Sequence, residues 1–199
     1  MANVDAPFGL RPVRHLNGNP WNGSTQRCLV EDDYGVALFI GDPVIVTGTA
    51  GADDTSGLPV INIATETHSN GVYGVIVSFE PNPDNLTLKH IPLSTGGYAN
   101  VCIDPDVIFI IQDNAGAVLD GGCISGNALL ESATAGSTIT GLSGWELDAA
   151  GVGANITYPL QILQKYMVEG NAMGNNCIWE VIISNHTLRN AAATGGIGI

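Results

Sequence analysis

Short apolar runs separated by turn-forming residues recur along most of this 199-residue chain, and they limit what it can fold into. Pairs such as Gly41-Asp42 and Asn70-Gly71 stand between runs that are rich in Val, Ile, Leu, Phe and Tyr. Regularly spaced runs of this kind are typical of antiparallel strands joined by tight turns. The sequence therefore predicts an all-β body, a sandwich or a barrel-like sheet. The clearest predicted strands lie at residues 25–30, 36–40, 43–47, 57–65, 71–80, 85–91, 97–103, 106–112 and 177–185.

Three segments allow a finer prediction. Residues 106–112 are apolar on both faces, so we expect a central strand that is covered on both sides. Residues 71–80 have only one strongly apolar face, which favours a half-buried strand. Residues 158–171 contain the best candidate for a helix, which we expect near 160–169, although partial alternation leaves a strand open. The helical spacing is carried by Leu160, Leu163, Tyr166 and Met167, with Pro159 near the start and Gly170 near the end.

Charge is distributed unevenly along the chain. The net charge is −13, yet residues 1–27 hold Arg11, Arg14 and Arg27 against the single acid Asp5. The remainder is strongly acidic and should repel phosphate, so direct binding to nucleic acid is not expected. No apolar run approaches the roughly 18 residues of a membrane span, and the first residues lack the apolar core of a signal peptide.

The opening residues predict three parts in the chain. Residues 1–24 contain Pro7, Pro12 and Pro20 and have no apolar periodicity, which favours an extended N-terminal arm. Residues 25–190 would form the β-rich body. Residues 191–199 would form a flexible apolar tail, either frayed or lying along another chain. Arg and Trp are enriched at binding hot spots, so the arm is expected to dock onto another protein, although a chance grouping of arginines is an alternative. The expected contact residues are Phe8, Leu10, Arg11, Arg14, Trp21 and Arg27.

A search for catalytic or metal-binding patterns finds none. Cys28, Cys102, Cys123 and Cys177 have no metal-ligand spacing and are expected to be buried free thiols. The four histidines lie far from one another and from the cysteines, and paired acids such as Asp104 and Asp106 fit turns better than a calcium loop. Phosphate-binding loops are absent, and "GLSGW" lacks one glycine of a nucleophile elbow. We therefore predict no catalytic residue, no cofactor and no metal site.

The sequence leaves one enzymatic alternative open. A β-sandwich glycan hydrolase needs two carboxylates that converge in a cleft. The candidates for such a pair are Glu66, Glu80, Glu131, Glu146 and Glu180.

Three stretches resemble a known family. "APFGLRPVRHLNGNPWNG" near the N-terminus, "YGVALFIGDPVIVTG" at 34–48 and "GVYGVIVSFEP" at 71–81 are similar to segments of the capsid decoration, or cement, proteins of tailed bacteriophages. The likeness is best over roughly the first 110 residues, and the remainder matches only in its strand-and-turn texture. Its motifs are structural, so no catalytic residue follows from it.

The resemblance implies a β-rich protein on the outer face of a virion capsid. Its partners would be the major capsid protein and further copies of itself, in a homo-oligomer that is expected to be a trimer. Its role would be to reinforce the contacts between capsid subunits. The alternatives are another structural component of the virion, such as a tail, fibre or head-tail connector protein, and, more distantly, the glycan hydrolase.

Overall fold

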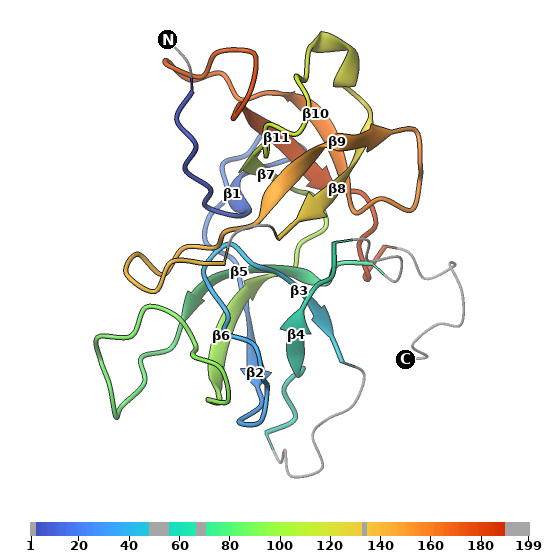
Figure 1. Ribbon diagram of the computed structural model, residues 1–199. Helices are drawn as coiled ribbons and strands as arrows, with labels where there is room; N and C mark the ends of the chain where they lie inside the picture. Colours follow the sequence, from blue (N-terminus) through green and yellow to red (C-terminus); the bar gives the residue numbers. More distant parts are fainter. Residues whose placement is uncertain (1–2, 48–55, 67–70, 133–134, 190–199) are drawn as a thin grey trace.

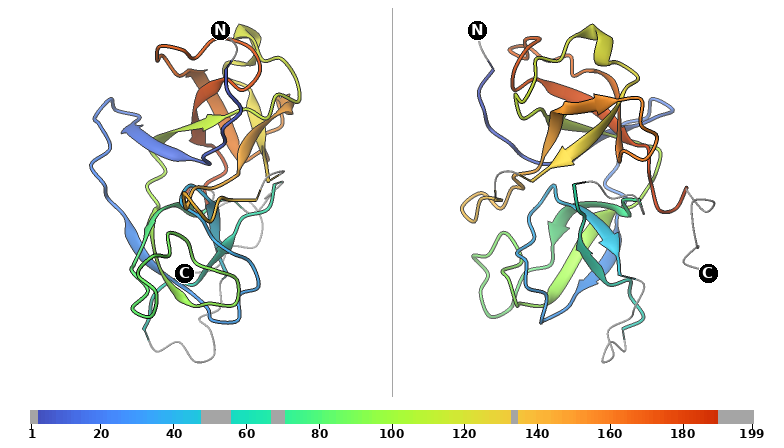
Figure 2. Two further views of the ribbon diagram at one scale, coloured as in Figure 1. Left: turned by 60° about the vertical axis from the view of Figure 1, so that its left-hand side comes forward. Right: turned by 45° about the vertical axis from the view of Figure 1, so that its right-hand side comes forward.

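The computed structural model describes residues 3–47, 56–66, 71–132 and 135–189. The described residues form eleven strands and one short 3₁₀ turn, Gly121–Cys123. The strands make two antiparallel sheets that pack together, one of six strands and one of five (Figure 1). Figure 2 shows the same two layers from two further sides. The prediction of an all-β protein is confirmed.

The six-stranded sheet curls, so that its last strand, β9, meets the end of its second strand, β7. Asp113, directly after β7, forms a parallel bridge with Leu147 of β9, and the amide of Asn114 donates to the Leu147 carbonyl at 3.0 Å. The curled sheet therefore encloses its own apolar interior. Its order is β1 (Arg11–His15), β7 (Val107–Gln112), β11 (Ile178–Ile183), β10 (Leu160–Lys165), β8 (Asn127–Glu131) and β9 (Glu146–Gly153).

The five-stranded sheet curls in the same way. Leu29 in its first strand forms a parallel bridge with Val60, just before its last strand, and the Leu29 amide donates to the Pro59 carbonyl at 2.9 Å. Both sheets are therefore barrel-like. The order here is β2 (Gln26–Val30), β6 (Gly97–Cys102), β5 (Gly74–Phe79), β3 (Pro43–Val46) and β4 (Ile61–Ile63).

Two apolar clusters correspond to the two sheets. The larger cluster fills the six-stranded sheet around Phe109 and Trp179 and also takes in Val75 and Cys102 from the five-stranded sheet. The smaller cluster lies inside the five-stranded sheet around Ile76. Because residues of both sheets share the larger cluster, the two layers are held together by continuous apolar packing.

Several predicted strands form as expected, and some do not. All six residues of β7 are buried, which confirms the strand covered on both sides. Residues 36–40 and 85–91 are not strands: Leu38 and Ile91 pair only with each other, in one isolated bridge. The prediction that residues 71–80 form a strand with only one buried face is also wrong. The strand in this segment, β5, lies between the two clusters and buries Val75 in the larger one and Ile76 in the smaller one.

The helix expected near 160–169 is wrong, because residues 160–165 form β10. Leu160 and Ile162 are fully buried while Gln161 between them is not, so the strand alternation holds in this segment. Neighbours on both sides, β8 and β11, supply backbone hydrogen bonds that a helix would forgo. Met167, which completed the helical spacing, is exposed beyond the end of the strand.

The free N-terminal arm is also corrected by the structure. Arg11–His15 form β1, which pairs with β7 of the same chain, and Leu10 is only 2% exposed. Before β1, the side-chain amide of Gln112 donates to the Val4 carbonyl and its oxygen accepts from the Ala6 amide. The division between an arm at 1–24 and a body at 25–190 therefore fails, because the first strand belongs to the body. The tail at 191–199 lies outside the described residues.

Candidate functional site

The three stretches that carry the family resemblance meet between the two sheets. The amide of Leu10 donates to the Gly41 carbonyl at 2.9 Å, and the amide of Gly41 donates to the Ile76 carbonyl at 2.8 Å. The amide of Ile76 in turn donates to the Asp42 carbonyl at 3.0 Å. We call residues 8–10, 41–43 and 74–76, with Ser143, the junction.

Two glycines make the junction possible. Gly9 has φ +70° and Gly41 has φ +100°, a region that other residues rarely adopt. A Cβ on Gly9 would lie 2.5 Å from the Gly41 oxygen and from the Ser143 Cβ, and one on Gly41 would lie 2.5 Å from the Phe8 oxygen. The backbones approach so closely that a side chain at either position would push the segments apart.

Four of the six predicted contact residues lie around the junction and β1. Leu10 is buried in the larger apolar cluster, so it is not available to a partner. Arg14 donates to Glu180 of β11 at 2.6 Å, and Gln164 of β10 donates to the same carboxylate oxygen at 3.0 Å. The Arg11 guanidinium lies 5.0 Å from the Phe8 ring centre, and Arg11 is exposed. Phe8 and Arg11 therefore remain as surface residues in this region.

The other two predicted contact residues lie elsewhere. Trp21 packs against the larger apolar cluster and is half-buried. Arg27, in β2, lies over the Tyr98 ring at 3.7 Å and makes two hydrogen bonds with Glu80, at 2.5 and 2.8 Å. The structure thus does not bring the six residues into one surface, because Arg27 belongs to the five-stranded sheet.

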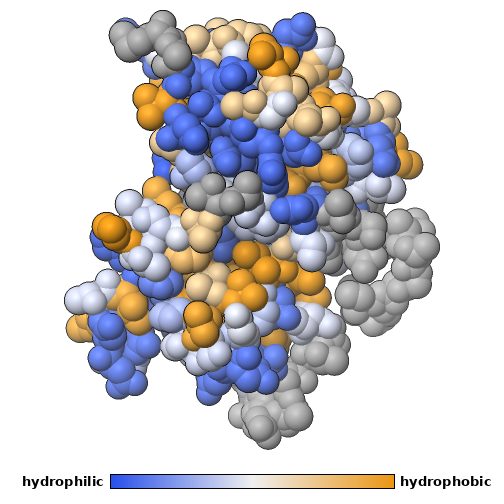
Figure 3. Space-filling model, in the orientation of Figure 1, coloured by the Kyte–Doolittle hydropathy of each residue, from blue (hydrophilic) through white to orange (hydrophobic). Residues whose placement is uncertain are grey.

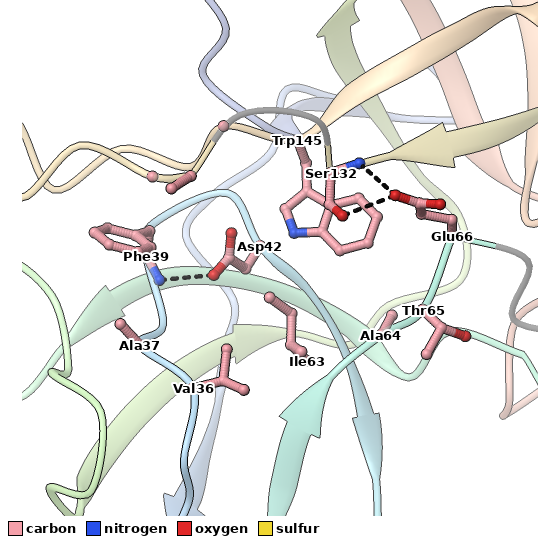
Figure 4. A pocket seen from close by; sticks show the side chains of 13 residues that line it. Val36, Ala37, Phe39, Asp42, Ile63, Ala64, Thr65, Glu66, Ser132 and Trp145 are labelled. Carbon is pink, nitrogen blue, oxygen red and sulfur yellow. Dashed lines mark hydrogen bonds between the residues drawn. The ribbon is translucent and has the colours of Figure 1, made fainter.

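A cleft opens beside the junction, where the two sheets face each other. It has a volume of about 570 Å³ and mostly apolar walls. Figure 4 shows Asp42 projecting between Phe39 and Trp145, with Glu66 on the opposite side bonded to Ser132. Figure 3 shows apolar side chains gathered over the lower half of this face, whereas hydrophilic ones cover much of the upper half.

Asp42 is the unusual group in this cleft. It is 1% exposed, and its carboxylate accepts hydrogen bonds from the Phe39 amide at 2.7 Å and from the Ser143 hydroxyl. Burial raises the pKa of Asp42 to about 6, although these two hydrogen bonds favour the ionised form. None of the ion pairs formed by the described residues involves Asp42.

A second group of acids lies at the edge of the six-stranded sheet. Glu131 of β8 faces Glu146 of β9 as a cross-strand pair. Burial, and then repulsion from Asp5, Glu131 and Asp113, raise the pKa of Glu146 to about 7. Like charges directly opposite each other destabilise an antiparallel pair of strands. Protonation of Glu146 therefore removes its repulsion with Glu131 and stabilises the pairing of β8 with β9.

Of the five glutamates weighed for a hydrolase, Glu131 and Glu146 are cross-strand neighbours, but neither lines a described hollow. Glu66 lines the cleft, whereas Glu80 lines a separate groove of about 660 Å³ beside the 80–97 loop. Glu131 and Glu146 line neither hollow, and Glu180 is occupied by Arg14. No two of the five share either of these hollows.

Other candidate chemistry is limited among the residues that the structure describes. In that part of the chain, no three His, Cys, Asp or Glu side chains are placed to hold a metal ion, and no helix has the length and apolar character needed to cross a membrane. All four cysteines are buried and free, as predicted. Asp104 accepts the Asp106 amide at 2.8 Å, which is the turn expected there.

Sequence reasoning missed the importance of Asp42. The sequence predicts a turn at Gly41-Asp42, and the structure has one, but this turn packs against Gly9 and Ser143, which are distant in the sequence. A usable signal was present, because an isolated acid between two apolar runs has no basic neighbour in the sequence.

Comparisons with known proteins add no relative. No family model, no characterised protein and no solved structure matches this chain.

Proposed function

We propose that this protein is a structural component of a bacteriophage virion. In this proposal it binds the outer surface of the capsid as a homo-oligomer, a trimer, and reinforces contacts between major capsid subunits. The observation that carries the proposal is the junction. The three stretches that resemble decoration proteins are separate in the sequence, yet they are joined directly by hydrogen bonds between Leu10, Gly41 and Ile76. If this chain and the decoration proteins have the same fold, the stretches in which they resemble each other should include residues that hold the fold together, as these do.

Surface chemistry supports the same role. Charged residues make up only 13% of the chain, and the net charge of −13 suits a surface that does not meet nucleic acid. Several large apolar side chains are exposed among the described residues, including Val4 and Leu16 near the first strand. Many identical copies bound side by side gain from multivalency, so each copy needs only modest contacts.

The proposal is tested by adding the purified protein to capsids of the encoding phage that lack it. Sedimentation followed by quantitative gels measures how many copies bind, and cryo-electron microscopy places them. We expect binding that saturates with copies spread over the whole outer shell, and a higher temperature for capsid disruption. Binding of a few copies at one vertex or on the tail would favour the other structural roles, and no binding would reject the proposal.

A pair of variants tests the surface around β1. Phe8→Ala combined with Arg11→Ala removes the contact between the half-buried Phe8 ring and the exposed Arg11 guanidinium. We expect it to weaken capsid binding at least tenfold. Lys89→Ala, an exposed cation beside the 80–97 groove, serves as the matched control and should bind normally. Equal binding by both variants would remove the β1 surface from the proposal.

A further inference from the structure

The cleft between the sheets combines apolar walls with unneutralised negative charge. Val36, Ile63 and Trp145 contribute apolar surface, while Asp42 and Glu66 contribute carboxylates from two sides (Figure 4). Glu66 accepts hydrogen bonds from the amide and hydroxyl of Ser132, at 3.1 and 2.8 Å. Both carboxylates are thus held in place by neutral donors only, and neither forms an ion pair with a described residue.

The chain has no lysine or arginine that could neutralise the cleft. It contains six such residues, all of them in the described part, and each is engaged elsewhere. Arg14, Arg27 and Arg189 form ion pairs with Glu180, Glu80 and Asp106. Lys89 and Lys165 donate to backbone carbonyls, and Arg11 lies over Phe8. None of the six lysines and arginines neutralises the cleft, so a cationic side chain from another molecule would be complementary to its carboxylates.

We infer that the cleft binds a lysine or arginine side chain presented by a partner protein. The aliphatic stem would lie against the apolar walls, and the charged head would point toward Asp42, with Glu66 adding negative charge from the opposite side. An acidic ligand would be repelled, and a purely apolar one would leave a buried carboxylate without a counter-charge. A metal ion fits poorly, because the described residues do not place three ligands together. This inference does not depend on the capsid proposal, since it requires only a protein with an accessible basic side chain.

The inference is tested with small probes on the whole protein. Nα-acetyl-lysine N-methylamide supplies the charged side chain, and Nα-acetyl-norleucine N-methylamide supplies the same stem without the charge. The assigned indole N–H resonance of Trp145 in ¹H–¹⁵N spectra reports on occupation of the cleft. We expect a saturable shift with the lysine probe, with a Kd of roughly 1–10 mM, and at least tenfold weaker binding of the norleucine probe.

Two variants separate charge from shape. Glu66→Gln lies at the exposed mouth, keeps an oxygen for Ser132, and should weaken the lysine probe severalfold. Asp42→Asn keeps an acceptor for the Phe39 amide and should weaken it at least tenfold. Asp84→Asn, in the separate groove, is the matched control and should have no effect. Equal binding of the two probes, or full affinity in Glu66→Gln, would overturn the inference even if Asp42→Asn failed to fold.

Discussion

At the scale of single residues, Arg14 is a structural residue of its own subunit. Its guanidinium reaches across β7 to the buried Glu180, so it holds the edge strand β1 to the centre of the six-stranded sheet. The charge of Glu180 can be tolerated in its buried position because Arg14 and Gln164 both donate to it. The prediction that Arg14 is free for a partner overlooked this pair, since the two residues are far apart in the sequence.

We expect Arg14→Ala to destabilise the fold by about 1–3 kcal/mol, because it leaves a buried carboxylate without its cation. Arg11→Ala, an exposed neighbour on the same strand, is the matched control and should change stability by less than about 0.5 kcal/mol. Urea denaturation followed by tryptophan fluorescence measures both. Equal stability of the two variants would show that the ion pair contributes nothing.

The raised pKa values of Glu146 and Asp42 predict how stability depends on pH. Both values, about 7 and about 6, lie above those of unfolded carboxyl groups, so the folded state binds protons more tightly than the unfolded state. Their contribution to the free energy of unfolding is fully present below the unfolded-state pKa values, at about pH 4, and is lost as the pH rises through 6 to 7. Other titratable groups also make the stability depend on pH, so the effect of one carboxyl group is measured by comparing a variant with the native protein.

Glu146→Gln should flatten the decrease in stability between pH 5 and pH 8, because the amide carries no charge at either pH. Glu169→Gln, an exposed acid beyond β10, should leave the pH profile of the native protein unchanged. Thermal unfolding at a series of pH values measures the difference. A Glu146→Gln profile that is identical to the native one would contradict the burial-based explanation.

At the scale of elements, the junction depends on two glycines that touch each other's backbones. Gly9→Ala and Gly41→Ala should each destabilise the protein by more than about 2 kcal/mol, because the added methyl group meets backbone atoms as well as an unfavourable φ. Gly18→Ala separates the two effects: Gly18 has φ +90° but no heavy atom near its Cβ position. It should cost about 1 kcal/mol, the penalty for the backbone conformation alone. Equal losses at all three positions would show that close packing is unimportant.

The elements that the sequence predicts well are those whose burial is uniform. Strand β7 is apolar at every position but its last, so its coverage on both faces follows from composition alone. For β10 the sequence favours a helix, because Leu160, Leu163 and Met167 match a helical stripe, and pairing with β8 and β11 is what makes the segment a strand. The junction could not be predicted, because contacts among Gly9, Gly41 and Ser143 depend on how distant segments are brought together.

At the scale of the whole molecule, the N-terminal residues are part of the fold. Removing residues 1–15 would take away β1 and Leu10 and expose one edge of β7. We therefore expect the truncated protein to lose cooperative unfolding, instead of leaving an intact body. Leu10→Ala should destabilise by about 2–4 kcal/mol, whereas Val4→Ala, 76% exposed, should change stability by less than about 0.5 kcal/mol. A stable, cooperatively folded truncation would restore the interpretation of a separate arm.

The curling of both sheets has a consequence for crowding. Open sheets present rows of unpaired N–H and C=O groups that template fibrous self-association. Here single bridges join Leu29 to Val60 and Asp113 to Leu147, and the outer side of β1 receives one amide from Trp21 and gives one to Asn19, so the ends of both sheets are partly paired. Because these edges are partly paired, we expect the protein to resist edge-to-edge association between copies at high concentration.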